Sequence, residues 1–159
     1  MEPAFARYRT AASDDIPGIL ELMQDYYAED RYPFDPDLSR QSLRQLAGDP
    51  QLGSLWVAAV GPRIVGYLAI TLGYSLEYGG RDAFIDELFI ARGYRGAGLG
   101  KEAIELAVQY CRSENVRALH LEVEKKRRAA ARLYERAGFE RHDRMLMTLS
   151  IDVPAQFGA

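Results

Sequence analysis

Residues 84–101 read Phe-Ile-Asp-Glu-Leu-Phe-Ile-Ala-Arg-Gly-Tyr-Arg-Gly-Ala-Gly-Leu-Gly-Lys. An apolar run with two adjacent acids, Asp86 and Glu87, is followed by a glycine-rich basic loop and then by a strongly amphipathic segment. This order predicts a strand, a tight loop and a helix whose first turn opens onto the loop. The unpaired N–H groups of a first helical turn and the helix dipole both favour negative charge. The stretch therefore predicts an anion-binding junction, for which a phosphate-bearing ligand is the expected occupant.

The bulk properties of the chain are those of an ordinary globular protein. Its 159 residues predict a single domain over 1–159, large enough for one substantial core. The net charge of −3 argues against a nucleic-acid binder, which would carry a basic excess. No apolar run approaches the ~20 residues needed to span a bilayer, and the N-terminus lacks a signal-peptide core. The single cysteine, Cys111, suits a reducing compartment, so a cytoplasmic protein without a membrane partner is expected.

Hydrophobic periodicity predicts the other elements. We expect strands at 5–10, 55–60, 64–72, 82–90 and 118–123, and a last strand within 144–151. Helices are expected at about 14–29, from an Asp35 or Asp37 cap to Gly48, from Leu99 to near Asn115, and in a short segment ended by Gly138. Residues 152–159 are expected to form a loose tail. The resulting order, β-α-α-β-β-β-α-β-α-β, indicates an α+β or α/β domain with helices packed on a mixed sheet.

The spacing of the glycines separates three kinds of phosphate-binding loop. A dinucleotide-binding fingerprint that starts at Gly96 needs its third glycine at position 101, which is Lys101. A P-loop needs Ser or Thr after its Gly-Lys pair to reach a magnesium ion, and Glu102 stands there instead. Both of these loops are therefore disfavoured.

The third pattern fits. Arg95-Gly96-Ala97-Gly98-Leu99-Gly100 resembles the Arg/Gln-x-x-Gly-x-Gly/Ala signature of the GCN5-related N-acetyltransferases, the GNAT superfamily, which bind acetyl-CoA. A second motif about 35 residues later, Leu133-Tyr134-Glu135-Arg136-Ala137-Gly138-Phe139, is similar to the family's late Leu-Tyr-x-x-x-Gly-Phe box. Two motifs joined by the expected helix and strand are far more specific than either alone. Two positions depart from the pattern: Arg92 stands where proline is frequent, and Arg127 where an asparagine often contacts the cofactor.

The resemblance implies an α/β (α+β) GNAT fold, with a mixed, mostly antiparallel central sheet of six to seven strands flanked by about four helices. It also implies an acetyl-CoA-dependent N-acetyltransferase that transfers acetyl directly to a primary amine in a ternary complex. A small cationic amine is the favoured acceptor. Protein or peptide N-acetylation and a non-catalytic acyl-CoA-binding module on the same fold stay open as alternatives. Because dimers are frequent in the family, a homodimer is an expectation by analogy.

The resemblance places the cofactor along the strand end and the loop. The backbones of Leu88, Phe89 and Ile90 are expected to hold the pantetheine arm, and the Leu88 N–H to polarise the thioester carbonyl. Glycines let the backbone approach a pyrophosphate because no Cβ blocks it. Arg92, Arg95 and Lys101 are expected to supply positive charge near the phosphates, although Arg92 is explained equally well as a solvated side chain. The expected phosphate-binding residues are Arg95, Gly96, Ala97, Gly98, Leu99, Gly100 and Lys101.

Three side chains are candidates for the chemistry. Tyr134 lies where the family places the tyrosine that protonates the departing thiolate, although a tyrosine packed on the helix stripe would look the same. Asp86 and Glu87 are consecutive on a strand, so alternation predicts that only one of them faces the acceptor. A carboxylate suits the role of proton acceptor for the attacking amine, and the resemblance slightly favours Asp86. A salt bridge to a nearby arginine is the competing interpretation for either acid.

The acceptor pocket is expected around the first long helix and two loops. Aromatic walls with acids suit a cationic amine through cation–π contacts and charge pairing, although tyrosines on a helix also suit a core. No metal-ligand spacing occurs in the sequence, so no metal is expected. The candidate substrate-binding residues are Tyr26, Tyr27, Phe34, Tyr74 and Glu77.

Overall fold

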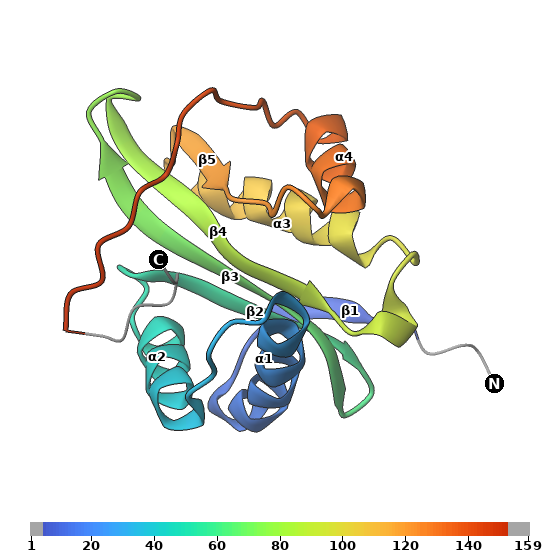
Figure 1. The fold of residues 1–159 in the computed structure, drawn as a ribbon. Helices are drawn as coiled ribbons and strands as arrows, with labels where there is room; N and C mark the ends of the chain where they lie inside the picture. Colours follow the sequence, from blue (N-terminus) through green and yellow to red (C-terminus); the bar gives the residue numbers. More distant parts are fainter. Residues whose placement is uncertain (1–4, 153–159) are drawn as a thin grey trace.

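The fold is built on one five-stranded sheet in the order β1-β2-β3-β4-β5 (Figure 1). The computed structural model describes residues 5–152, so the predicted tail lies outside the described residues except for Asp152. Neighbouring strands are antiparallel except for β4 and β5, which are parallel. This confirms the mixed, mostly antiparallel sheet. The strands are β1 (Arg7–Thr10), β2 (Gly53–Val60), β3 (Arg63–Ser75), β4 (Gly80–Ile90) and β5 (Ala118–Leu121).

Four α-helices cover the two faces of the sheet, as expected. Helices α1 and α2 lie on one face, and α3 and α4 on the other (Figure 1). Within residues 5–152, no helix is long and apolar enough to cross a membrane. The helices are α1 (Ile16–Asp30), α2 (Pro36–Gly48), α3 (Leu99–Ser113) and α4 (Arg128–Arg136), with short 3-10 turns η1 (Ser13–Asp15) and η2 (Arg92–Tyr94).

The central strand β3 separates two hydrophobic layers. Tyr67 and Ala69 pack in the layer with α1 and α2, whereas Leu68 and Ile70 pack in the layer with α3. All four side chains are at most 3% exposed, because helices cover both faces. A strand covered on both faces reads as a continuous apolar run rather than as an alternating one.

Polar side chains define where the first two helices begin. Asp15 precedes α1, where its carboxylate accepts two hydrogen bonds from the guanidinium of Arg9, at 2.6 and 2.7 Å. Asp35 caps α2 by accepting hydrogen bonds from the N–H groups of Asp37 and Leu38, both at 3.0 Å. The capping residue of α2 is therefore Asp35, one of the two predicted candidates.

The strand count differs from the expectation of six to seven. Residues 144–151, where a last strand was predicted, are not in a strand. Alternation of apolar residues favours a strand only when a neighbouring strand supplies backbone partners. Among the described residues, no backbone hydrogen bond joins 144–151 to another element, so this segment does not form a strand.

Candidate active site

The second half of β4 has an open edge. On one side β4 pairs with β3 up to Ile90, but on the other it pairs with β5 only from Asp82 to Ile85. In the described chain, the outer edge of β4 between Asp86 and Ile90 has no strand beside it. An extended ligand can form β-type hydrogen bonds with such an edge. The predicted pantetheine contacts, Leu88, Phe89 and Ile90, all lie here.

The glycines of the loop have separate structural roles. Gly96 and Gly98 have φ angles of 79° and 88°, which lie in the left-handed region that favours glycine. Gly98 immediately precedes α3, and among the residues that the structure describes no side chain caps the first turn of that helix. At Gly100 a Cβ would lie only 2.9 Å from Leu133 Cδ2, so glycine lets α3 begin against α4. The result is an α3 N-terminus with uncapped N–H groups behind a glycine loop, as an anion site requires.

The arginines of the loop are directed toward α1. Arg95 donates hydrogen bonds to the carbonyl of Ile90 at 2.7 Å and to the Glu29 carboxylate at 3.1 and 3.3 Å. Arg92 donates to the same carboxylate at 3.0 Å. Burial would raise the pKa of Glu29, but the hydrogen bonds and charges of the two arginines lower it below its ordinary value. Both guanidinium groups, which we expected near the phosphates, are thus paired with an internal acid.

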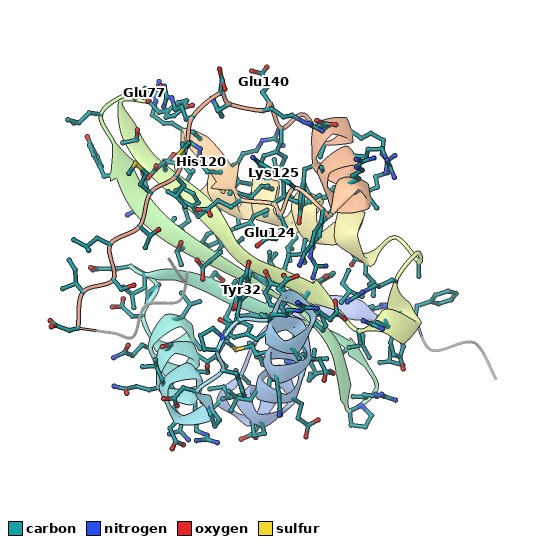
Figure 2. All side chains as sticks on the ribbon, in the orientation of Figure 1. Tyr32, Glu77, His120, Glu124, Lys125 and Glu140 are labelled. Carbon is teal, nitrogen blue, oxygen red and sulfur yellow. The ribbon has the colours of Figure 1, made fainter. Side chains whose placement is uncertain are left out.

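Arg127, which departs from the family pattern, joins α1 to α4. Its guanidinium donates to Asp30 Oδ1 at 2.6 and 3.2 Å, and Lys126 Nζ lies 3.6 Å from the same oxygen. The Asp30 side chain is only 1% exposed. Figure 2 shows a second connection, in which Tyr32 reaches toward Glu124 in the loop after β5, and the Tyr32 hydroxyl donates a hydrogen bond to that carboxylate. The end of α1 is therefore tied to the β5–α4 loop by two polar contacts.

A β-bulge changes the orientation of the two acids on β4. Asp86 is an extra residue between Ile85 and Glu87, which pair with successive residues of β3. Ile85 packs in the α3 layer, whereas Phe89, an even number of residues away, packs in the α1 layer. Strict alternation, which predicted opposite directions for Asp86 and Glu87, is therefore wrong at this point. The reason is that a bulge places two residues opposite one and breaks the period of two.

Glu87 has the most perturbed carboxyl group of the site. Burial raises its pKa to about 7, hydrogen bonding from Tyr27 and Tyr67 opposes the rise, and the charge of Asp86 adds to it. Tyr67 is fully buried, and its hydroxyl has no well-formed hydrogen bond within residues 5–152. Asp86 acts on the same tyrosines, because its charge helps to raise the pKa of both. Desolvation also raises the pKa of Asp86, but solvent reaches this side chain more readily than that of Glu87.

The tyrosines that interact with the Glu87 carboxyl group belong to a cluster of aromatic rings. Tyr26 and Tyr27 meet edge to face with ring centroids 5.6 Å apart, and Tyr26 stacks on Phe89 at 5.4 Å. Phe34 meets Tyr27 at 5.7 Å. Tyr134 on α4 lies near enough to Tyr26 that its ionised form would add slightly to the raised pKa of Tyr26, and its ring contacts Phe139 at 5.9 Å. Burial raises the pKa of Tyr134 itself, and nearby Arg127 opposes this rise.

Two predicted substrate residues lie elsewhere. Tyr74 is seven residues beyond Tyr67 on β3, and a strand advances by about 3.3 Å per residue. Its side chain is 74% exposed near the β3–β4 turn. Glu77 lies in that turn and pairs with Arg144 at 2.8 and 2.9 Å. The structure therefore brings Tyr26 and Tyr27 to Glu87, with Phe34 against Tyr27, but it does not bring Tyr74 or Glu77 there.

Sequence reasoning missed several residues that shape the site. Tyr67 lies in an apolar run and was not singled out. A lone hydroxyl at the centre of a buried strand is nevertheless a useful signal, because a buried polar group needs a polar partner. Asp30 is the last residue of α1, where the helix dipole disfavours acids, and this anomaly could have indicated a cationic partner. Glu124 and Tyr32 give no such signal, because their contact joins residues far apart in the chain.

Comparisons with known proteins agree with the geometry. An N-acetyltransferase of Methanocaldococcus jannaschii is 28% identical over 135 residues, which cover 83% of this chain but only 59% of that protein. The thialysine N-epsilon-acetyltransferase of Bos taurus is 25% identical over 144 residues, covering 85% of this chain and 84% of that protein. The crystal structure of an integron cassette protein from a salt-marsh metagenome is 37% identical, with a TM-score of 0.82 over 92% of this chain and 91% of that one. Residues 17–139 match the model of the acetyltransferase (GNAT) family, and the chain therefore belongs to the GNAT family.

Proposed function

We propose that this protein is an acetyl-CoA-dependent N-acetyltransferase that transfers acetyl directly to a primary amine of a small cationic molecule within a ternary complex. One observation carries the proposal. Glu87, a half-buried acid of β4 with a pKa of about 7, interacts with Tyr27 and Tyr67 and lies on the part of β4 whose open edge leads to the glycine loop. An acid with a pKa near the working pH is suited to accept a proton during catalysis. Membership of the acetyltransferase family supports an acetyl donor.

The proposed acetyl-CoA site follows the open edge and the loop. The backbone of Leu88 to Ile90 would pair with the extended pantetheine arm, and the uncapped first turn of α3 would receive the pyrophosphate. The left-handed glycines leave the room that side chains would fill. Arg95 would bind a phosphate only by exchanging part of its contact with Glu29. The proposed cofactor residues are Leu88, Phe89, Ile90, Arg95, Gly96, Ala97, Gly98, Leu99, Gly100 and Lys101.

The proposed chemistry divides between two elements. On β4, the Glu87 carboxylate accepts the proton that the attacking amine loses, while the Leu88 N–H stabilises the oxygen of the thioester carbonyl as negative charge develops. Asp86 supports the base by raising the pKa of Glu87. On α4, Tyr134 gives a proton to the departing thiolate, a role that suits a phenol kept neutral by its raised pKa. The geometry thus supports Glu87 over Asp86 as the base.

The aromatic and acidic surroundings support a small cationic acceptor. Tyr26, Tyr27 and Phe34 can contact a cation with their ring faces, and two carboxyl groups lie beside them. The contacts of Asp30 with Arg127 and of Tyr32 with Glu124 cross from α1 to the β5–α4 loop, where an extended peptide would need space. The bovine relative is named for acetylating thialysine, which is also a small amine.

The test is CoA release measured with matched sets of acceptors. We expect turnover with small diamines and amino sugars, and at least tenfold lower kcat/KM with peptides that carry the same primary amine. Preference for peptides would overturn the acceptor class while leaving the enzyme intact. Binding of CoA without turnover of any amine would overturn the proposed activity, and a non-catalytic module would then be the better description.

A further inference from the structure

The carboxylate of Glu29, near the end of α1, is surrounded by cations. Arg92 donates a hydrogen bond to it at 3.0 Å and Arg95 donates at 3.1 and 3.3 Å. The guanidinium of Arg127 lies 3.5 Å from its Oε2 atom. The Glu29 side chain is only 15% exposed. This one acid therefore has three guanidinium groups within reach, although a single partner would balance its charge.

Two of these arginines stand where the sequence departs from the family pattern. Arg92 takes the place of a frequent proline, and Arg127 that of an asparagine that often contacts the cofactor. Neither proline nor asparagine carries a charge with which to pair a carboxylate. Both departures therefore add positive charge around the same acid, Glu29.

The third arginine, Arg95, differs from the other two because it belongs to the glycine loop itself. Its Nε donates to the carbonyl of Ile90 at 2.7 Å, and its guanidinium lies over the ring of Phe89 at 5.2 Å. A guanidinium has five N–H donors in a fixed fork, and the contacts with Ile90 and Glu29 use only some of them. Because the Arg95 side chain is 38% exposed, its other donors can reach a ligand that arrives from solvent.

Glu29 can lose Arg95 as a partner without becoming an unpaired charge. Burial opposes its ionisation, but the hydrogen bonds and charges of Arg92 and Arg95 hold the pKa of Glu29 below its ordinary value, so it is an anion at neutral pH. With Arg95 turned toward a phosphate, Arg92 and Arg127 would still balance that anion. The movement needs little repacking, because Glu29 and Arg92 line an open cleft of about 450 Å³ between α1 and the end of β4.

We propose that Glu29 is a positioning residue that competes with the cofactor: it holds Arg95 when no cofactor is bound, and Arg95 exchanges this carboxylate for the pyrophosphate when acetyl-CoA binds. The inference rests on the acetyl-CoA site proposed above. Arg92 and Arg127 keep Glu29 paired after the exchange. Because the acid and the phosphates compete for one guanidinium, Glu29 weakens the binding of the cofactor and speeds the release of CoA after transfer.

Binding of CoA, measured by calorimetry, and of pantetheine, measured by NMR, tests the exchange. Glu29→Gln keeps the size of the side chain but removes the competing charge, so the Kd of CoA should fall by about three- to tenfold. The dissociation rate of CoA should slow by a similar factor. Pantetheine carries no phosphate, so its Kd should change by less than about twofold. Asp25→Asn is the matched control, since it removes an exposed acid one turn earlier on α1 that lines the same cleft, and it should leave both Kd values within about twofold.

A double-mutant cycle tests whether Glu29 acts through Arg95. Arg95→Ala should weaken CoA binding, and adding Glu29→Gln to it should then change the Kd by no more than about twofold. Glu29→Asp, which draws the carboxylate back by one methylene, should lower the Kd of CoA in the same direction and serves as the second variant if Glu29→Gln does not fold.

The outcomes separate this inference from the proposed function. Unchanged or weaker CoA binding in the Glu29 variants, in a protein that binds CoA as wild type, would overturn the exchange and leave the cofactor site intact. An equal gain for CoA and pantetheine would also contradict the exchange, because it would show a general structural effect. A wild-type protein that binds no CoA would instead overturn the proposed function.

Discussion

The two sides of the open β4 edge are built very differently. On the α1 side, Tyr67, Ile19 and Val57 are fully buried, and Phe89 is only 4% exposed. On the α4 side, no residue of the helix is buried. The proposed base therefore lies on a rigid, well-packed layer, while the proposed acid, Tyr134, lies on a helix held by few apolar contacts. In such a site the relative position of acid and base depends on the polar contacts that cross between the two sides.

Because α4 has few apolar contacts, the ion pairs at the end of α1 are expected to hold the two sides in position. Glu29 holds Arg92 and Arg95 of the loop after β4, and Asp30 holds Arg127 at the start of α4. Two neighbouring acids thus connect the rigid side, the glycine loop and the weakly packed helix. Variants that affect only one side should separate chemistry from positioning.

The largest effect is expected at the base on the rigid side. Glu87→Gln keeps the shape of the side chain but cannot accept a proton, so kcat/KM should fall by about 10²- to 10⁴-fold. Binding of CoA, measured by calorimetry, should stay within about twofold. Glu122→Gln, at an exposed position just after β5, is the control and should behave as wild type. A Glu87→Gln enzyme with wild-type turnover would remove Glu87 from the mechanism.

A smaller loss is expected for the acid on the weakly packed side. Tyr134→Phe removes only the hydroxyl, so kcat should fall by roughly 10²-fold, the lower end of the range for proton transfer, because water can also protonate a thiolate. Apparent affinity for acetyl-CoA should change little. Tyr110→Phe on α3 serves as the control. Unchanged kcat in Tyr134→Phe would indicate that this tyrosine only packs.

Breaking the connection between the two sides should affect both stability and rate. Arg127→Ala leaves the Asp30 carboxylate, which is 1% exposed, without its main partner. The expected loss of unfolding free energy is about 2 kcal/mol, below the range for a fully buried pair because Arg127 is partly exposed and Lys126 remains. Urea denaturation measures this loss, and kcat should fall about tenfold as Tyr134 loses its position. Arg128→Ala, an exposed neighbour, should show neither change.

The raised pKa of Glu87 should also make the stability of the protein depend on pH. Because the folded protein raises the pKa of Glu87 to about 7, its contribution to stability is fully present below the unfolded pKa of about 4.5 and is lost as pH rises through 7. The free energy of unfolding should therefore fall between pH 5 and 8 by on the order of 1–3 kcal/mol. Glu87→Gln should flatten this slope. A slope that is the same in wild type and Glu87→Gln would show that other groups cause it.

The smallest effect is expected for Tyr74, near the turn between β3 and β4. Tyr74 is exposed and lies away from the aromatic cluster, so Tyr74→Ala should change kcat/KM by less than about twofold. Tyr26→Ala, within the cluster, is the matched comparison and should raise KM for the amine. A large loss in Tyr74→Ala would mean that the acceptor reaches the β3–β4 turn.

Local patterns in the sequence predicted most of the fold, including the strand, loop and helix of residues 84–101. The strand, loop and helix within 84–101 formed as expected, and so did the Asp35 cap. Each depends on residues close together in the chain. The bulge at Asp86 was not predictable in the same way, because it depends on the register with β3. Register depends on how two strands pair. The alternation of residues along one strand therefore cannot reveal a bulge.

Long-range polar pairs and missing neighbours account for the other differences. Arg127 and Asp30 are 97 residues apart, and Arg95 and Glu29 are 66 apart, so no local pattern could pair them. The segment 144–151 has the alternation of a strand, but within residues 5–152 no strand lies hydrogen-bonded beside it. Its alternating pattern indicates a segment that needs a neighbouring strand and a core on one face.

The dependence of kcat/KM on pH tests the central claim most directly. It should be measured for wild type, Glu87→Gln and Asp86→Asn, with two acceptors whose amine pKa values differ. We predict a rising limb with a midpoint near pH 7 in wild type that does not move with the acceptor, because it reports the raised pKa of Glu87. The limb should persist, shifted to lower pH, in Asp86→Asn and disappear in Glu87→Gln. A limb that follows the pKa of the amine, or that survives unchanged in Glu87→Gln, would contradict the account.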